Sequence, residues 1–211
     1  MGVLLAILLI SGGNILYDLK LARVKYRGGG DWYNDPDVLP NLAKYINKHT
    51  NLKVDPKEYV VTFDNPDLFR FPILYLTGHG NIRLSEEEVK NLRNYLENGG
   101  FLYIDDDYGL DKYIRRELKK VFPEKKLVEI PFDHPIYHAF FDFKKGLPKI
   151  HEHYKGPPHG FGIFVKGRLA VFYTFNTNIS DGWTPRHGDP PVKREEAFRM
   201  GTNIVLYSVV Y

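Results

Sequence analysis

Apolar runs that end in polar residues alternate with helical patterns through the middle of the chain. Residues 71–77 (FPILYLT) are almost continuously apolar and lead into the GHG turn at residues 78–80. Residues 101–104 (FLYI) form a second such run, which leads into three aspartates at residues 105–107. Continuous apolar runs are typical of parallel strands that are covered on both faces. The pattern therefore predicts two parallel strands with polar side chains at their carboxyl ends.

A helix is predicted between these two strands. Ser85 and Glu88 have the spacing of a capping box, in which the two side chains satisfy backbone amides at a helix start. Leu92 and Leu96 repeat at the helical period, and Gly99 follows where a helix commonly ends. A strand–helix–strand unit of this kind builds a parallel sheet, whose carboxyl edge is where ligands bind in open α/β folds.

The same criteria predict the remaining elements, ending in a hairpin and a closing helix. Further strands are predicted at 19–26, 58–63, 127–130, 161–165 and 168–175, and further helices at about 35–48, 110–121 and 193–210. The predicted fold is a single α/β domain over residues 19–211. It is expected to be a three-layer sandwich with about five or six mainly parallel strands.

Residues 1–18 contain an apolar stretch, Val3–Ile10 (VLLAILLI). Eight residues would rise only about 12 Å as a helix, which is too short to span a bilayer. The stretch lacks the basic segment and the cleavage site of a complete signal peptide. It is therefore either the remnant of an export signal or a terminal element packed on the domain. No integral membrane span is expected.

Composition excludes several classes of function. The 211 residues are 43% hydrophobic and 15% aromatic, enough for a packed core, and the net charge of +3 is too small to indicate nucleic-acid binding. The chain has no cysteine. Disulfides, thiolate nucleophiles and cysteine-ligated metal sites are therefore excluded.

The two strand ends carry the first candidate site residues. A histidine between glycines can be presented to a ligand at the sheet edge, although a tight turn with an exposed histidine would look the same. Adjacent carboxylates repel one another, so at least one should be paired, bound to a metal or capping the next helix. The candidates are Gly78, His79, Gly80, Asp105, Asp106 and Asp107.

Residues 131–162 hold five of the eight histidines in a segment rich in proline and glycine. They include His134, in an Asp-His-Pro motif, and His151 and His153, in a His-Glu-His motif. Imidazoles combined with carboxylates suit zinc and similar metals. Because no HExxH motif occurs and His-x-His is common by chance, histidines that cap loops or pack at the sheet edge are the favoured explanation, and a metal site is the alternative.

Four segments resemble the DUF4159 family of bacterial proteins. They are ARVKYRGGGDWYNDP, FPILYLTGHG, NGGFLYIDDDYG and the His-Pro segment DHPIYHAFFDF. The resemblance covers about residues 20–211 and implies a flavodoxin-like sandwich of the class I glutamine amidotransferase-like type, shared with ThuA-like proteins. In amidotransferases the strand matching GGFLYID leads to the nucleophilic cysteine, where this chain has Asp105–Asp107. Amidotransferase activity is therefore excluded, and the family implies no other reaction or cofactor. Many relatives are exported or joined to membrane segments, which favours an exported or envelope-associated protein over a cytoplasmic one.

These observations favour a binding or accessory domain over an enzyme. The expected ligand is small and polar, such as a carbohydrate, and its pocket would add His134, Trp32 and Trp183 to the two strand ends. A metal-assisted hydrolase is the alternative, with metal ligands drawn from His79, Asp106, Asp107, His134 and His153. A structural envelope scaffold is the third possibility. Oligomeric state does not follow from the sequence.

Overall fold

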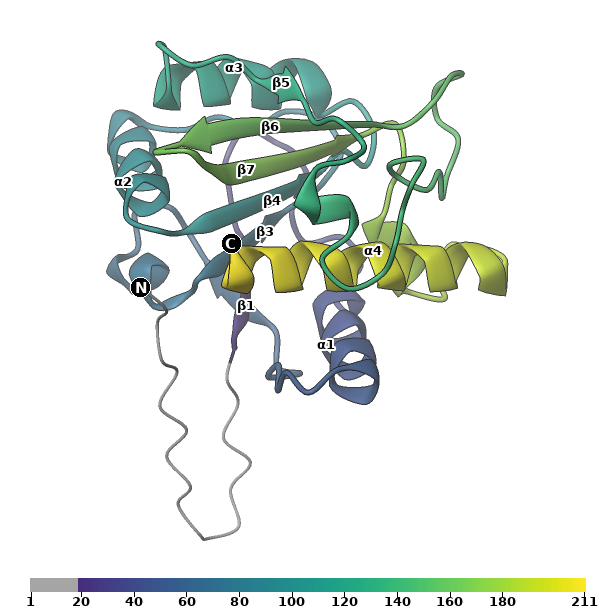
Figure 1. The fold of residues 1–211 in the computed structure, drawn as a ribbon. Coiled ribbons are helices and arrows are strands. Elements are labelled where there is room, and N and C mark those ends of the chain that lie inside the picture. The colour runs from purple at the N-terminus through teal and green to yellow at the C-terminus, as the bar shows by residue number, and fades with distance from the viewer. Residues whose placement is uncertain (1–18) are drawn as a thin grey trace, which may run out of the picture.

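The computed structural model describes residues 19–211, so the apolar segment at 1–18 lies outside the described residues. Within these residues the chain forms seven strands and four α-helices (Figure 1). The elements are β1 (Leu21–Val24), α1 (Val38–His49), β2 (Tyr59–Val61), β3 (Ile73–Leu76), α2 (Glu86–Glu97), β4 (Phe101–Asp105), α3 (Asp111–Val121), β5 (Val128–Glu129), β6 (His159–Val165), β7 (Arg168–Phe175) and α4 (Pro191–Val210), with 3-10 turns η1 (Pro66–Arg70), η2 (Pro135–Tyr137) and η3 (Ser180–Trp183).

All seven strands form one sheet in the order β2-β1-β3-β4-β7-β6-β5. The first five strands in this order are parallel to one another, while β6 pairs antiparallel with both β7 and β5. The predicted α/β class, mainly parallel sheet and C-terminal hairpin are confirmed. The expected count of five or six strands was too low, because all seven predicted strands join one sheet. The order of the five parallel strands is that of flavodoxin-like sheets.

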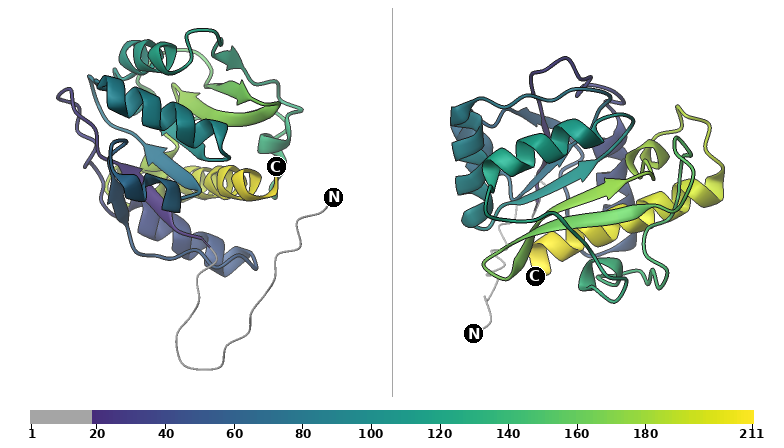
Figure 2. Two further views of the ribbon diagram at one scale, coloured as in Figure 1. Left: turned by 90° about the vertical axis from the view of Figure 1, so that its left-hand side faces the viewer. Right: turned by 90° about the horizontal axis from the view of Figure 1, so that it is seen from above.

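Helices cover both faces of the sheet, with α1 and α4 on one side and α2 and α3 on the other (Figure 2). Alternate strand residues supply the two cores: Tyr75 and Tyr103 face the α1 and α4 layer, whereas Leu74 and Leu102 face α2 and α3. Both layers are required because the central strands are buried on both faces. The carboxyl edge of the sheet is not covered by these helices and is lined by loops.

Local signals account for the ends of α2. The Ser85 hydroxyl accepts from the Glu88 amide at 3.2 Å, and the Glu88 carboxylate accepts from the Ser85 amide at 2.7 Å. This confirms the predicted capping box. Gly100 lies against the Tyr95 ring, where an added Cβ would be 2.3 Å from a ring carbon. A glycine is thus needed for the chain to pass from α2 into β4.

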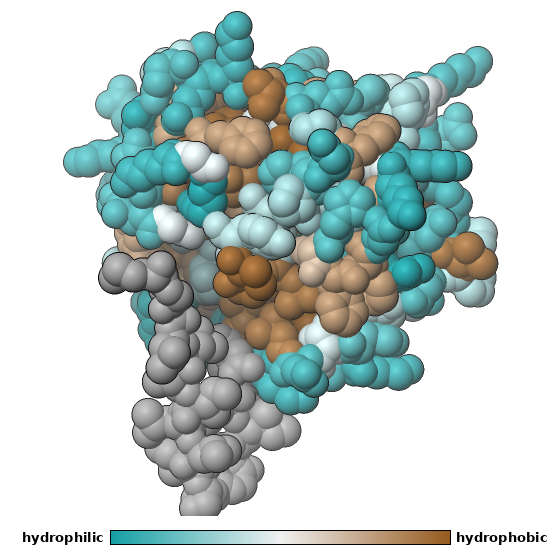
Figure 3. All heavy atoms as spheres, in the orientation of Figure 1, coloured by the Kyte–Doolittle hydropathy of each residue, from teal (hydrophilic) through white to brown (hydrophobic). Residues whose placement is uncertain are grey.

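The face that bears α4 is a mosaic of apolar and polar side chains (Figure 3). At the end of α4, Val209 and Val210 are exposed. Within residues 19–211, the length and hydropathy needed to cross a bilayer are not found in any helix.

Candidate functional site

Polar side chains converge at the carboxyl edge of the parallel strands. They come from the loops that follow β1, β3, β4 and β7, and from two segments near residues 151 and 187. In a flavodoxin-like sheet the strand order reverses between β1 and β3, because successive strands are added first on one side of β1 and then on the other, and a crevice opens there. The loop after β1 and the loop after β3 meet at this point, so the topology itself brings the polar residues together.

His79 lies at the end of β3 and contacts two carboxylates. Its Nδ1 is 2.9 Å from Asp31 Oδ2 and 3.2 Å from Asp107 Oδ2. Burial opposes the imidazolium, but Asp107 and Asp31 outweigh it and raise the pKa of His79 above its ordinary value. The preceding Gly78 has φ +137°, and an added Cβ would be 2.3 Å from the Tyr26 hydroxyl. Only glycine permits this close approach, which sets the position of His79.

Asp107 is the buried centre of the strand-end cluster. Asn178 donates to its Oδ1 at 2.9 Å and to its main-chain carbonyl at 2.7 Å, and Asn34 donates to Oδ2. Burial and the nearby Asp181 raise the pKa of Asp107 to about 7, although His79 lowers it. His79 and Asp107 therefore both hold protons more tightly than usual, Asp107 mainly because it is buried and His79 because carboxylates surround it.

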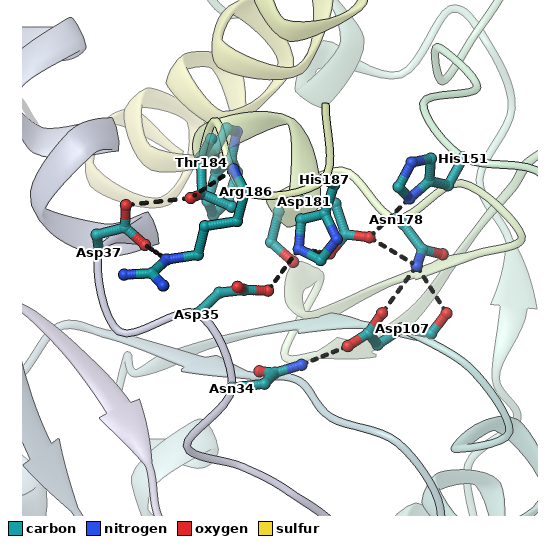
Figure 4. A network of polar contacts seen from close by, with 12 residues as sticks. Asn34, Asp35, Asp37, Asp107, His151, Asn178, Asp181, Thr184, Arg186 and His187 are labelled. Carbon is teal, nitrogen blue, oxygen red and sulfur yellow. Dashed lines mark hydrogen bonds and ion pairs between the residues drawn. The ribbon is translucent and has the colours of Figure 1, made fainter. Parts of the chain in front are cut away.

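Asp181 joins this cluster to a second group of histidines (Figure 4). Its Oδ2 accepts from Asn178 at 3.2 Å and lies 2.9 Å from Nδ1 of His151. Its Oδ1 lies 3.8 Å from Nε2 of His187, which is 2.7 Å from Asp35 Oδ2. Asp181 is 3% exposed, so a buried carboxylate stands between two imidazoles.

The other two aspartates at the end of β4 point elsewhere. Asp105 is fully buried and accepts from the Ser180 amide and hydroxyl, each at 2.7 Å, and from the Thr174 hydroxyl. It therefore fastens η3 to the sheet. Asp106 lies on the α3 side, where its Oδ1 accepts from the Leu110 amide at 2.9 Å. Of the three predicted aspartates, only Asp107 belongs to the polar cluster.

The remaining predicted site residues are dispersed. His134 caps η2 and contacts Phe164 and Tyr207; since Tyr207 also contacts Phe101, His134 lies near the start of β4, at the opposite edge. Trp183 is 1% exposed and belongs to the core, where its indole donates to the Ala197 carbonyl at 2.9 Å. Trp32 is half-buried in the loop after β1, with Lys25 over its ring.

The family model described as Domain of unknown function (DUF4159) matches residues 20–209. The chain belongs to the DUF4159 family. This confirms the family predicted from the sequence. Compared with curated proteins, the chain matches none.

A groove of about 630 Å³ borders the polar cluster of this DUF4159 domain. Its wall includes His79 and Gly80 from the β3 end, and the rings of Tyr108, Tyr154 and Phe175. Tyr154 stacks between the other two rings, with centroids 5.3 Å from Tyr108 and 5.6 Å from Phe175. Tyr108 is 48% exposed and Tyr154 36%. The groove therefore combines an accessible aromatic surface with a histidine that contacts the acidic cluster.

Several members of the cluster were not predicted from the sequence. Asn178 and Asp181 could have been found from their position, because they follow the end of β7 as Asp107 follows the end of β4. These residues are 71 or more positions apart in the chain, and they meet because β4 pairs with β7 in parallel. The residues missed are Asp31, Asn34, Asp35, Asn178, Asp181, His187 and Asp189.

Replacing Asp105 by alanine should lower the free energy of unfolding of this DUF4159 domain by about 3 kcal/mol or more. The change leaves the buried amide and hydroxyl of Ser180 without their acceptor, each costing about 1–3 kcal/mol, whereas the Thr174 hydroxyl keeps the Ile104 carbonyl at 3.3 Å. Asp105→Asn keeps an acceptor oxygen and removes a buried charge, so it should cost clearly less. Urea unfolding at pH 7 measures both. Equal losses for the two variants would contradict the anchoring role.

Proposed function

We propose that this DUF4159 domain binds a neutral, hydroxyl-rich ligand such as a carbohydrate in the groove beside His79. One observation carries the proposal: the exposed rings of Tyr108 and Tyr154 adjoin the acidic cluster through the groove wall. Aromatic faces pack against the C–H surfaces of sugar rings, and carboxylates and carboxamides accept and donate hydrogen bonds to hydroxyl groups. A sugar presents both surfaces at once.

The charge of the site favours a neutral ligand over a phosphorylated one. Asp31, Asp107 and Asp181 lie together with His79, and this excess of carboxylates repels an anion. Among the described residues, Lys112 is the one lysine or arginine in the groove wall, which also contains Asp111. A nucleotide or sugar phosphate would need several cations or backbone amides directed at its oxygens. The hydroxyl groups of an uncharged sugar have no such requirement.

We further propose that the scaffold is amidotransferase-like but serves as a binding or accessory domain. The flavodoxin-like strand order is compatible with that fold, and the absence of cysteine removes the thiolate on which its chemistry depends. An exported or envelope-associated location would suit a domain that meets carbohydrate. The competing hypothesis is that the domain is a structural scaffold, in which case the groove binds no ligand.

Titration with neutral oligosaccharides tests the binding function. Saturable heat or fluorescence change is expected with at least one of a panel of soluble glycans, and Tyr108→Ala should weaken it about tenfold, equivalent to about 1.4 kcal/mol. Tyr211→Ala removes a ring that is 59% exposed at the end of the chain, and should leave affinity unchanged. Binding that survives Tyr108→Ala and Tyr154→Ala together would move the site away from the groove. A complete lack of binding across the panel would favour the scaffold.

A further inference from the structure

We propose that this domain also binds a divalent transition metal of the zinc class through His151, His153 and Asp181. One potential ligand atom from each of these residues lies within 4.8 Å of the others. Two imidazoles and one carboxylate form a donor set that zinc and its neighbours accept, and three protein ligands leave a further coordination position open. The proposal does not depend on the identity of the groove ligand.

The local backbone brings the two histidines together. The amides of Ile150 and His151 both donate to the Thr177 carbonyl, at 3.1 and 3.0 Å, so this segment is held beside the end of β7. Glu152, which stands between the two histidines in the chain, is exposed. The ring centroids of His151 and His153 are 5.9 Å apart. The His-x-His spacing therefore has a structural role here.

A second carboxylate orients His151 as a metal ligand. Nε2 of His151 lies 2.9 Å from Asp189 Oδ1, and the Asp189 side chain is 3% exposed. When Nε2–H donates to Asp189, Nδ1 carries its lone pair toward Asp181 Oδ2, 2.9 Å away. Two lone pairs at that separation repel unless a proton or a cation lies between them. Histidine ligands of metals are commonly held by such a carboxylate.

The charge balance also indicates a cation. Asp107, Asp181 and Asp189 are at most 9% exposed, and their ion pairs within residues 19–211 are with histidines. Oδ2 of Asp189 is buried and has no hydrogen-bond partner in the part of the chain that the structure describes. Buried carboxylates are retained at low cost only when they are paired or coordinate a metal. A bound dication would supply the missing positive charge.

His153 is a better candidate ligand than the nearby His187, because its imidazole is not engaged in a hydrogen bond with any of the described residues. His153 has ring contacts with Tyr108 and His151, but among the residues 19–211 it has no hydrogen-bond partner. His187 instead lies 2.7 Å from Asp35, at the other oxygen of Asp181. His153 is thus available as a ligand without breaking an existing contact. Because Tyr108 lines the groove, the metal would lie next to the groove.

Titration of chelator-treated, full-length protein with Zn²⁺ tests the proposal. We expect one equivalent to bind at the His151 site and Co²⁺ to give the visible absorption of nitrogen and oxygen coordination. His153→Gln should weaken Zn²⁺ binding at least tenfold, and Asp189→Asn about 10–100-fold. His153 is exposed, so its replacement should leave the fold intact, which circular dichroism can check. His49→Gln, at the exposed end of α1, is the matched control and should bind as wild type does.

Two outcomes would overturn the metal site. One is wild-type protein that takes up no stoichiometric Zn²⁺. The other is equal Zn²⁺ affinity in wild type and the His153→Gln variant, which would mean that any uptake occurs at unrelated surface groups.

Discussion

Replacing Arg23 by methionine should lower the free energy of unfolding by about 3–5 kcal/mol, the usual cost of removing one partner from a buried ion pair. Arg23 is 1% exposed and its Nε lies 2.7 Å from Glu58 Oε1. Its other nitrogens donate to three main-chain carbonyls of the loop after β1, those of Trp32, Asn34 and Asp35, at 2.8–3.0 Å. Methionine fills a similar volume but leaves all four acceptors unpaired.

The same substitution should disturb the candidate site, because Arg23 holds the loop that supplies part of it. Asp35 has φ +46°, an unfavourable conformation for a residue other than glycine, which its surroundings must maintain. We expect Arg23→Lys to lower the free energy of unfolding as well, because a single ammonium cannot reproduce the forked contacts of a guanidinium. Arg70 pairs with Asp67 at 3.3 Å on the surface, so Arg70→Met should change stability by no more than about 0.5 kcal/mol. Urea unfolding of the three variants decides the matter, and a loss below about 1 kcal/mol for Arg23→Met would contradict it.

The fold could be predicted from the sequence because its signals are local. Ser85 and Glu88 are three residues apart and determine the start of α2 without help from the rest of the chain. The hairpin between β6 and β7 turns at Lys166 and Gly167, both at positive φ, as the dipeptide suggests. The short β5 was predicted as a strand, but its antiparallel pairing with β6 depends on contacts more than 30 residues away.

The candidate site could be predicted only in part, because strand-end position does not determine where a side chain points. Successive residues at the end of β4 alternate between the faces of the sheet, so Asp105 and Asp106 have different environments and neither joins the polar cluster. Asp107 contacts His79, as the strand-end argument led us to expect of neighbouring parallel strands. The partners from the loops after β1 and β7 required the strand order, which no local pattern encodes.

The predicted tryptophans show a second reason for incomplete prediction. Trp183 is the last residue of η3, in a polar segment where sequence alone suggests exposure, yet it packs against Tyr75 and Tyr103 in the core. The accessible rings beside the cluster belong instead to Tyr108 and Tyr154. A large aromatic residue in a loop can be a core residue or a binding surface, and only burial distinguishes them.

Asp106 should make the protein less stable as the pH rises above about 4, and the Asp106→Asn substitution should remove this effect. Its side chain is 1% exposed, Oδ2 has no hydrogen-bond partner in residues 19–211, and burial raises its pKa from 3.8 to about 6. Between these two values the folded protein keeps a proton that the unfolded chain has released. The contribution of Asp106 to the free energy of unfolding therefore falls as pH rises from about 4 to 6, by about 3 kcal/mol, at 1.36 kcal/mol for each unit of pKa difference.

Asp106→Asn abolishes this dependence, so the variant should match wild type near pH 4 and be more stable by up to about 3 kcal/mol at pH 7–8. The start of α3 opposes the effect, because the positive end of a helix stabilises a nearby carboxylate. That contribution is about 0.3–1 kcal/mol and at most about 2, which is smaller than the penalty from burial. Urea unfolding at unit steps from pH 4 to pH 8 measures the difference, with the exposed Asp133→Asn as a control whose offset from wild type should be constant. If Asp106→Asn were instead the less stable protein at pH 8, the helix end would outweigh burial, and Asp106 would be an ionised cap of α3.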